Sequence, residues 1–182
     1  MRMICICNKK SLRYIFIVGN NADRNRFLSP CFLEKEELRI YCRDETTARA
    51  SWQSFIEAGA KLLRAQHTEA AFLELGSGLH VAHRQLQISE PPTWRWAMRL
   101  VESTNMLVVA LNSLGYEEII GPLLDNVRGL IRSLPALEKC PEGKNAAWLC
   151  RWCESMACPR RQAQMARMYE LSSKAEHMCS LH

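Results

Sequence analysis

The residues best suited to chemistry are three cysteines near the carboxyl end of the chain, Cys150, Cys153 and Cys158. Zinc is usually held by four nitrogen or sulfur ligands, and a Cys-x-x-Cys pair such as Cys150 and Cys153 is a common half of such a site. No second pair follows to complete it. Both cysteines also lie beside Trp148 and Trp152 in an apolar helical pattern, where cysteine packs as a small hydrophobe. We therefore predict core packing for Cys150 and Cys153 and no metal site, with a zinc-stabilised helical domain or a redox pair as alternatives.

Two histidines have a spacing that would suit a metal ion or a catalytic base. His80 and His83 are three residues apart and would share one helix face. No carboxylate or cysteine accompanies them nearby, so we expect both to face solvent beside the apolar Leu79 and Ala82. The sequence has no glycine-rich phosphate loop, Gly-x-Ser-x-Gly turn or His-Glu-x-x-His helix. We predict a protein that is not an enzyme and holds no cofactor.

An aromatic and cationic cluster is formed by Trp94, Arg95 and Trp96, with Met98 and Arg99 following. Tryptophan and arginine are the residue types that dominate binding hot spots. We expect one tryptophan to belong to the core and the other to lie exposed beside an arginine. This cluster therefore indicates binding of a partner rather than catalysis.

The composition is that of one ordinary globular domain. The chain has 182 residues, of which 48% are hydrophobic and 24% charged, enough to bury a core without disulfides or metal. The formal charge of +5 is modest, and its surplus lies toward the two ends of the chain. Nucleic-acid-binding domains usually gather basic residues on one face. We expect another protein or a peptide as the partner, with nucleic-acid binding through the basic residues 1–47 as an alternative.

The cysteines and the apolar runs predict the compartment. Nine cysteines, an odd number at uneven spacing, favour reduced thiols over a disulfide framework. The opening residues lack the apolar stretch and cleavage site of a signal peptide. No apolar run approaches the ~18 residues that a spanning helix needs. We expect a cytoplasmic protein, or alternatively a nuclear one, without membrane association.

Residues 1–47 differ in texture from the rest of the chain. Two β-favouring runs, Arg13–Val18 and Leu38–Cys42, flank a polar stretch that contains turn residues. They predict a small strand pair, or alternatively a loosely docked arm, because two strands alone are marginally stable. Thr46 or Thr47 is expected to cap the first long helix.

Residues 48–182 are predicted to be helical. Apolar residues recur at steps of three and four, the period of amphipathic helices, with breaks at residues 66–68, 89–93 and 115. Thr93, at the end of the second break, is the expected cap of one helix and Gly115 its expected stop, and Pro122 is expected in the first turn of the next helix. Two further helices are expected at about 146–157 and 160–178. Six helices in three antiparallel pairs give an all-α fold, either a closed bundle or an open stack of αα-hairpins.

The first predicted pair, residues 52–85, has an ordered alternation of large and small side chains: Phe55, Ala58, Gly59 and Leu62, then Ala71, Leu75 and Gly78. This order resembles the tetratricopeptide repeat, a family in which small residues let the two helices of a pair approach closely. The family's closing proline is absent. The pairs at about 93–134 and 146–178 keep the plan with few signature residues. The resemblance implies an all-α stack of αα-hairpins, a solenoid.

The resemblance also implies a function. Members of the family are adaptors or scaffolds that bind a peptide or partner helix in a groove lined by the first helix of each pair. The chaperone-binding members hold a C-terminal carboxylate with a clamp of basic residues and asparagine. In this sequence Ile56 and Ala60 occupy the positions where that clamp would begin, which argues against chaperone tails as partners. The weakly polar residues 178–182 predict self-association through the C-terminal helix. The residues expected to contact a partner are Arg64, Trp94, Arg95, Glu102, Asn105 and Asn112.

Overall fold

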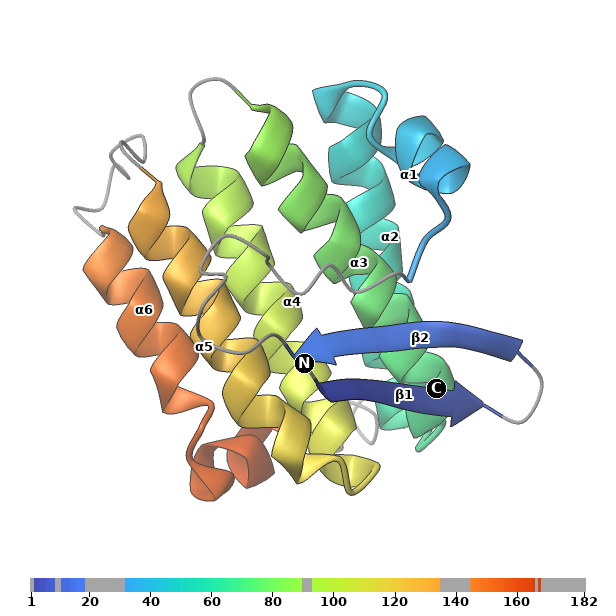
Figure 1. Ribbon diagram of the computed structural model, residues 1–182, viewed down its shortest axis with the longest axis vertical. Coiled ribbons are helices and arrows are strands. Elements are labelled where there is room, and N and C mark those ends of the chain that lie inside the picture. The colour runs from blue at the N-terminus through green and yellow to red at the C-terminus, as the bar shows by residue number, and fades with distance from the viewer. Residues whose placement is uncertain are drawn as a thin grey trace, which may run out of the picture.

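In a computed structural model of the protein, helices make up about three quarters of the described chain beside one pair of strands, and the fold is all-α as expected (Figure 1). The structure describes residues 2–8, 11–18, 32–89, 93–134, 145–165 and 167, and for residues 2–8 and 11–18 it describes the strands but not the side chains. None of the helices in these ranges is long and apolar enough to cross a membrane. The helices are α1 Lys35–Tyr41, α2 Glu45–Arg64, α3 Thr68–Ile88, α4 Trp94–Ser113, α5 Glu117–Ser133 and α6 Ala146–Ser155, and residues 159–165 form a further helical segment.

The long helices pack in chain order. α2 contacts α3, α3 contacts α4, α4 contacts α5, and α5 contacts α6 (Figure 1). Helices that are neighbours along the chain run antiparallel in Figure 1, so α2, α4 and α6 run in one direction, and α4 also contacts both α2 and α6. This arrangement is compatible with a helical repeat.

Glycines set the close approach of α2 to α3. A Cβ atom at Gly59 would lie 2.5 Å from Cδ2 of Leu75, and one at Gly78 would lie 3.0 Å from Cδ1 of Ile56. Both distances are shorter than an ordinary van der Waals contact, so a larger side chain would force the helices apart. The prediction that small residues serve packing in this pair is confirmed.

α4 is the central helix of the described fold. Every residue from Leu100 to Leu111 is buried except Glu102. An amphipathic surface helix buries only one stripe, whereas α4 is contacted by α2, α3, α5 and α6. Consequently α4 exposes a narrow row of side chains near its amino end and the residues Asn112 and Ser113 at its carboxyl end.

The ends of α4 and α5 follow the expected signals with one difference. Thr93 caps α4 by accepting a hydrogen bond from Trp96 N, and Gly115 follows the helix with a φ of 76°. Pro122 lies in the second turn of α5, one turn deeper than expected. Its ring leaves the carbonyl of Glu118 without a helical donor, and Glu118 is exposed to water, so the proline is tolerated there.

The prediction of a strand at Leu38–Cys42 is wrong, because Leu38–Tyr41 belongs to α1. The backbone N–H of Glu34 donates to the Glu37 carboxylate (2.8 Å), and Glu36 pairs with Arg39 one turn later. These local contacts start a helix and outweigh a weak β preference. The partner of the run Arg13–Val18 comes from elsewhere: β2 (Ser11–Val18) pairs antiparallel with β1 (Arg2–Asn8).

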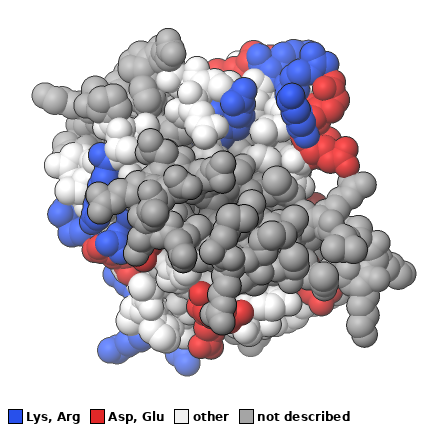
Figure 2. Space-filling model, viewed as in Figure 1, with Lys and Arg blue, Asp and Glu red and all other residues white. Residues whose placement is uncertain are grey.

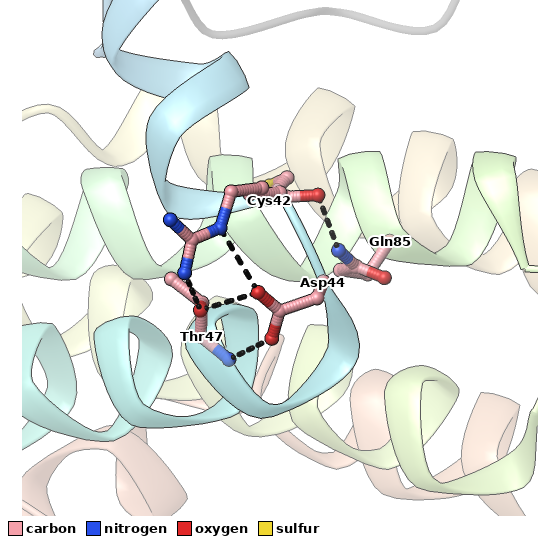
Figure 3. Close-up of polar contacts among 5 residues, drawn as sticks. Cys42, Asp44, Thr47 and Gln85 are labelled. Atoms are coloured by element: carbon pink, nitrogen blue, oxygen red, sulfur yellow. Dashed lines mark hydrogen bonds and ion pairs between the residues drawn. The ribbon is translucent and has the colours of Figure 1, made fainter.

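The turn between α1 and α2 is fixed by polar contacts (Figure 3). Asp44 caps α2 in place of the expected Thr46 or Thr47, because its carboxylate accepts from both the backbone N–H (2.8 Å) and the hydroxyl (2.8 Å) of Thr47. These hydrogen bonds and Arg43 hold the pKa of Asp44 at about 2. Gln85 of α3 donates to the carbonyl of Cys42 at 3.3 Å, which ties the turn to the helical body.

Candidate functional site

Two rows of side chains face each other where α2 lies beside α4. On each helix the spacing is i, i+4, i+7, which places the row on one face. Trp52 joins the helices directly: its indole N–H donates to the Ser103 hydroxyl (2.9 Å), which donates to the carbonyl of Arg99 (2.8 Å). We call the two rows the α2–α4 stripe, which consists of Glu45, Arg49 and Trp52 on α2 and Arg95, Arg99 and Glu102 on α4.

Arg99 is the centre of the α2–α4 stripe. Its guanidinium carbon lies 4.4 Å from the centroid of the Trp96 ring and 5.3 Å from that of Trp52. Cation–π contacts of this kind fix the plane of an arginine. Burial lowers the pKa of Arg99, and Arg49 and Arg95 lower it further. Even so, arginine remains a cation in proteins, so the α2–α4 stripe carries a positioned positive charge.

The positioned arginine has an unused donor. Nη1 of Arg99 is buried and has no hydrogen-bond partner, and the same holds for Nε1 of Trp96. A buried donor without an acceptor costs about 1–3 kcal/mol, which a carbonyl or carboxylate would recover only if the side chains that cover the donor moved aside. Glu102 is half-buried beside Arg99, and burial raises the pKa of its carboxyl group. The α2–α4 stripe therefore combines a fixed cation, an aromatic face and a partly desolvated carboxyl group.

The structure brings together only some of the residues predicted from the sequence. Arg95 and Glu102 lie on the α2–α4 stripe, and Arg95 is exposed. Arg64 is the last residue of α2, about three turns from Trp52, and is half-buried. Asn112 is exposed near the carboxyl end of α4, away from the stripe.

Two of the predicted contact residues belong to the interior. Asn105 is 2% exposed, so the expectation that it faces a groove is wrong: four helices surround this part of α4. Trp94 is also buried, with its ring centroid 6.2 Å from that of Trp148 on α6. The expectation that one tryptophan of the pair is exposed is wrong as well, because Trp96 is fully buried. The partly exposed tryptophan beside Arg99 is Trp52 instead. The sequence pattern places Trp52 only at the start of the first predicted repeat and gives it no binding role.

A second hollow lies between α1 and the carboxyl-terminal half of α3. This α1–α3 pocket has a volume of about 600 Å³. His80 and His83 line it and are 7% and 3% exposed, so the expectation that both face solvent is wrong. The expectation assumed an uncovered face of α3, and α1 covers that face. Burial and Arg84 lower the pKa of both rings to about 4, and for His83 the neighbouring His80 contributes too.

The cysteines form no metal site in the described part of the chain. Cys150 and Cys153 are buried, and their Sγ atoms lie 4.0 Å from the carbonyl oxygens of Arg128 and Leu124 on α5. Burial raises the pKa of Cys153 to about 12, which keeps its thiol protonated. Cys158 is exposed, and the backbone N–H groups of Arg161 and Arg160 lower its pKa. Within the described ranges, no group of three His, Cys, Asp or Glu side chains could hold a metal ion, and the prediction of core packing for Cys150 and Cys153 is confirmed.

Comparison with known proteins assigns no role to this arrangement. No protein-family model matches the sequence, and neither curated proteins nor solved structures give a significant match. The residues that can be assigned a role are therefore those that the geometry itself singles out. Arg49 and Trp52, and the lining of the α1–α3 pocket other than His80 and His83, are the ones that sequence patterns did not identify as a site.

Proposed function

We propose that this protein is a non-enzymatic interaction module, an adaptor or scaffold, that binds a segment of a partner protein on the α2–α4 stripe. The observation that carries the proposal is the half-buried guanidinium of Arg99, held between Trp52 and Trp96 with its Nη1 unpaired. A partner carbonyl or carboxylate would accept from the accessible edge of this guanidinium, and charge-assisted bonds of this kind are strong. Trp52 is partly exposed and offers an apolar contact for a partner side chain.

The repeat character of the fold is part of the same proposal. We propose a tetratricopeptide-like stack in which α2 and α4 are the first helices of two pairs. The glycine contacts between α2 and α3 support this assignment, as does the order of helix contacts along the chain. In this family the first helices carry the binding face. The α2–α4 stripe lies on these helices, with Arg95 and Glu102 among its members.

The roles of the remaining predicted residues follow from their placement. Trp94 and Asn105 are buried, so they support α4 from within. Arg64 and Asn112 lie toward the carboxyl ends of α2 and α4, where they would meet only a partner long enough to extend beyond the α2–α4 stripe. A peptide in contact with both Trp52 and Arg64 would span about 18 Å along α2.

The proposal is tested by site-specific photo-cross-linking in an extract of the native cells. A photoreactive amino acid replaces Met98, which lies between Arg95 and Glu102 on α4. The matched control position is Arg132, an exposed residue near the end of α5. We expect a discrete cross-linked partner from position 98 and none from position 132.

A second variant tests whether the cross-linked adduct formed from position 98 depends on Arg99. Arg99→Gln in the Met98 background removes the charge and the stacking, and should reduce the adduct at least tenfold, as for a binding hot spot. Circular dichroism checks that this variant keeps its helical content. The same adducts at both positions, or an adduct that survives Arg99→Gln, would contradict the proposal.

A further inference from the structure

The α1–α3 pocket is separate from the α2–α4 stripe and has an unusual charge distribution. Lys and Arg side chains gather over α1 and the neighbouring end of α3, at the upper right of the view (Figure 2). The volume of about 600 Å³ is that of a pocket for a small molecule. The charged lining residues are Lys35, Glu36, Arg39 and Arg43 from α1 and the turn after it, with Arg84 from α3.

Two of these cations lack a counter-charge. Arg39 is paired with Glu36, and Arg43 with Asp44 at 3.1 Å. Among the described residues, Lys35 and Arg84 have no ion-pair or hydrogen-bond partner. They stand on different helices, one on each side of the α1–α3 pocket. The pocket therefore carries about two uncompensated positive charges, because its other cations are balanced locally.

Neutral donors complete the lining. The backbone N–H of Leu33 donates to Nδ1 of His80 at 3.3 Å, so the ring proton lies on Nε2 and is available as a donor. The side-chain nitrogen of Gln87 lies 3.2 Å from Nε2 of His83. Leu38 and Ile88 add apolar surface, and Ile88 is 42% exposed. Cys42 completes the lining, and burial raises the pKa of its thiol.

We propose that the α1–α3 pocket binds a small phosphate monoester whose phosphate lies between Lys35 and Arg84 and whose apolar group contacts Leu38 and Ile88. A monoester dianion matches the two uncompensated cations. Its oxygens need several donors, which arginine, lysine, imidazole and amide groups provide. The buried ring of His80 adds one further donor, its Nε2–H.

The test uses phenyl phosphate as the probe and isothermal titration calorimetry of the full chain. Wild-type protein is expected to bind phenyl phosphate more tightly than inorganic phosphate, because only the former reaches the apolar lining. Arg84→Ala and Lys35→Ala should each weaken binding at least tenfold. Both residues are exposed, and circular dichroism confirms that the variants fold. Arg132→Ala is the matched control, with the same loss of charge at an exposed helical position, and should leave the affinity unchanged.

Several outcomes would overturn the proposal. One is absence of heat from phenyl phosphate at millimolar concentrations, and another is equal weakening by Arg84→Ala and Arg132→Ala. Binding of a glutamate-rich peptide without binding of phenyl phosphate would assign the pocket to an acidic protein segment instead. Phenol serves as the uncharged probe, and if it binds as tightly as phenyl phosphate the charge argument fails.

Discussion

The α1–α3 pocket and the α2–α4 stripe are both rich in arginine, yet they hold positive charge in opposite ways. In the stripe, Arg99 is fixed between Trp52 and Trp96, and carboxylates of the same surface lie close by. In the pocket, Lys35 and Arg84 flank a hollow and have no counter-charge among the described residues. The stripe lacks one acceptor, and the pocket lacks about two negative charges. What each site still lacks therefore indicates the ligand better than the number of its arginines.

The two sites also differ in how their walls are anchored. α1, one wall of the pocket, has no buried residue of its own. It is held at its ends: Phe32 packs edge-on against Phe72 with ring centroids 5.2 Å apart, and the Cys42 carbonyl accepts from Gln85. The walls of the stripe are long helices that share the core of the protein. We therefore expect damage at the pocket to stay local and damage beneath the stripe to be global.

The largest expected effect comes from Trp96→Ala. Trp96 is fully buried in the central helix, and loss of a buried tryptophan typically costs about 3–5 kcal/mol of unfolding free energy. Urea denaturation followed by circular dichroism measures the change. Trp52→Ala is the comparison, because the Trp52 ring contacts the same guanidinium group of Arg99 but is only half-buried. This substitution should lower the unfolding free energy clearly less than Trp96→Ala. Equal losses of unfolding free energy in the two variants would mean that the buried Trp96 ring does not support the α2–α4 stripe.

The pH dependence of the unfolding free energy tests the α1–α3 pocket, because His80 and His83 lie there and the α2–α4 stripe contains no histidine. The folded-state pKa of His80 and of His83 is about 4, against about 6.5 in an unfolded chain. Between these values the unfolded state binds more protons, so the unfolding free energy falls as the pH falls. For both rings together the loss between pH 7 and pH 5 is on the order of 3 kcal/mol.

The variant His80→Gln/His83→Gln isolates this contribution. It should have a much flatter dependence of unfolding free energy on pH than the wild type over the same range. His67→Gln, at an exposed position before α3, should keep the wild-type slope. If the double variant also keeps that slope, the two rings are not buried as neutral groups.

A smaller effect is expected at Gly76, where the ring of Phe32 occupies the position that a Cβ atom would take. Gly76→Ala should displace Phe32 and with it α1, at a cost of about 1–3 kcal/mol. Gly129→Ala is the matched control: a Cβ atom there meets nothing within 4 Å, and alanine should stabilise the helix by about 0.5–1 kcal/mol. Thermal melts give both values. Stabilisation by both substitutions would show that Phe32 does not anchor α1.

Features fixed by local sequence could be predicted. The apolar period of three and four located the long helices, and Gly115 and Thr93 marked helix ends through their own backbone and side-chain chemistry. The small residues of the first pair, such as Gly59, identified the close approach of α2 to α3. In each case the cause lies within a few residues of the effect or in the pattern of one helix pair.

Features that depend on distant segments could not be predicted. His80 and His83 are buried because α1, more than 35 positions earlier in the chain, covers their face of α3. Asn105 is buried because other helices surround α4. The periodicity of apolar residues identifies only the apolar face of a single helix. A polar residue on another face is therefore predicted to be exposed, even where a second helix buries that face. The strand expected at Leu38–Cys42 failed for a local reason, because the capping contact between Glu37 and the backbone N–H of Glu34 outweighs a weak β propensity.

The smallest expected effect concerns the two asparagines of α4, and it separates support from contact. Oδ1 of Asn105 is buried without a hydrogen-bond partner, so an apolar side chain with the same number of heavy atoms, such as leucine, removes an uncompensated polar group. Asn105→Leu should therefore keep or raise the unfolding free energy, within about 1 kcal/mol. Asn112→Ala, at an exposed position, should change it by at most about 0.5 kcal/mol.

Cross-linking from position 98 distinguishes the two roles of Asn105. If Asn105 only supports α4, Asn105→Leu leaves both the melting temperature and the adduct essentially unchanged, since the variant alters neither Arg99 nor Trp52. An adduct lost at unchanged stability would show instead that the Asn105 amide contacts the partner, and the binding surface would then extend along α4 beyond the α2–α4 stripe. Loss of stability and adduct together would mean that leucine does not fit among the helices packed around α4. The expectation that leucine can replace Asn105 without loss of unfolding free energy would then be wrong.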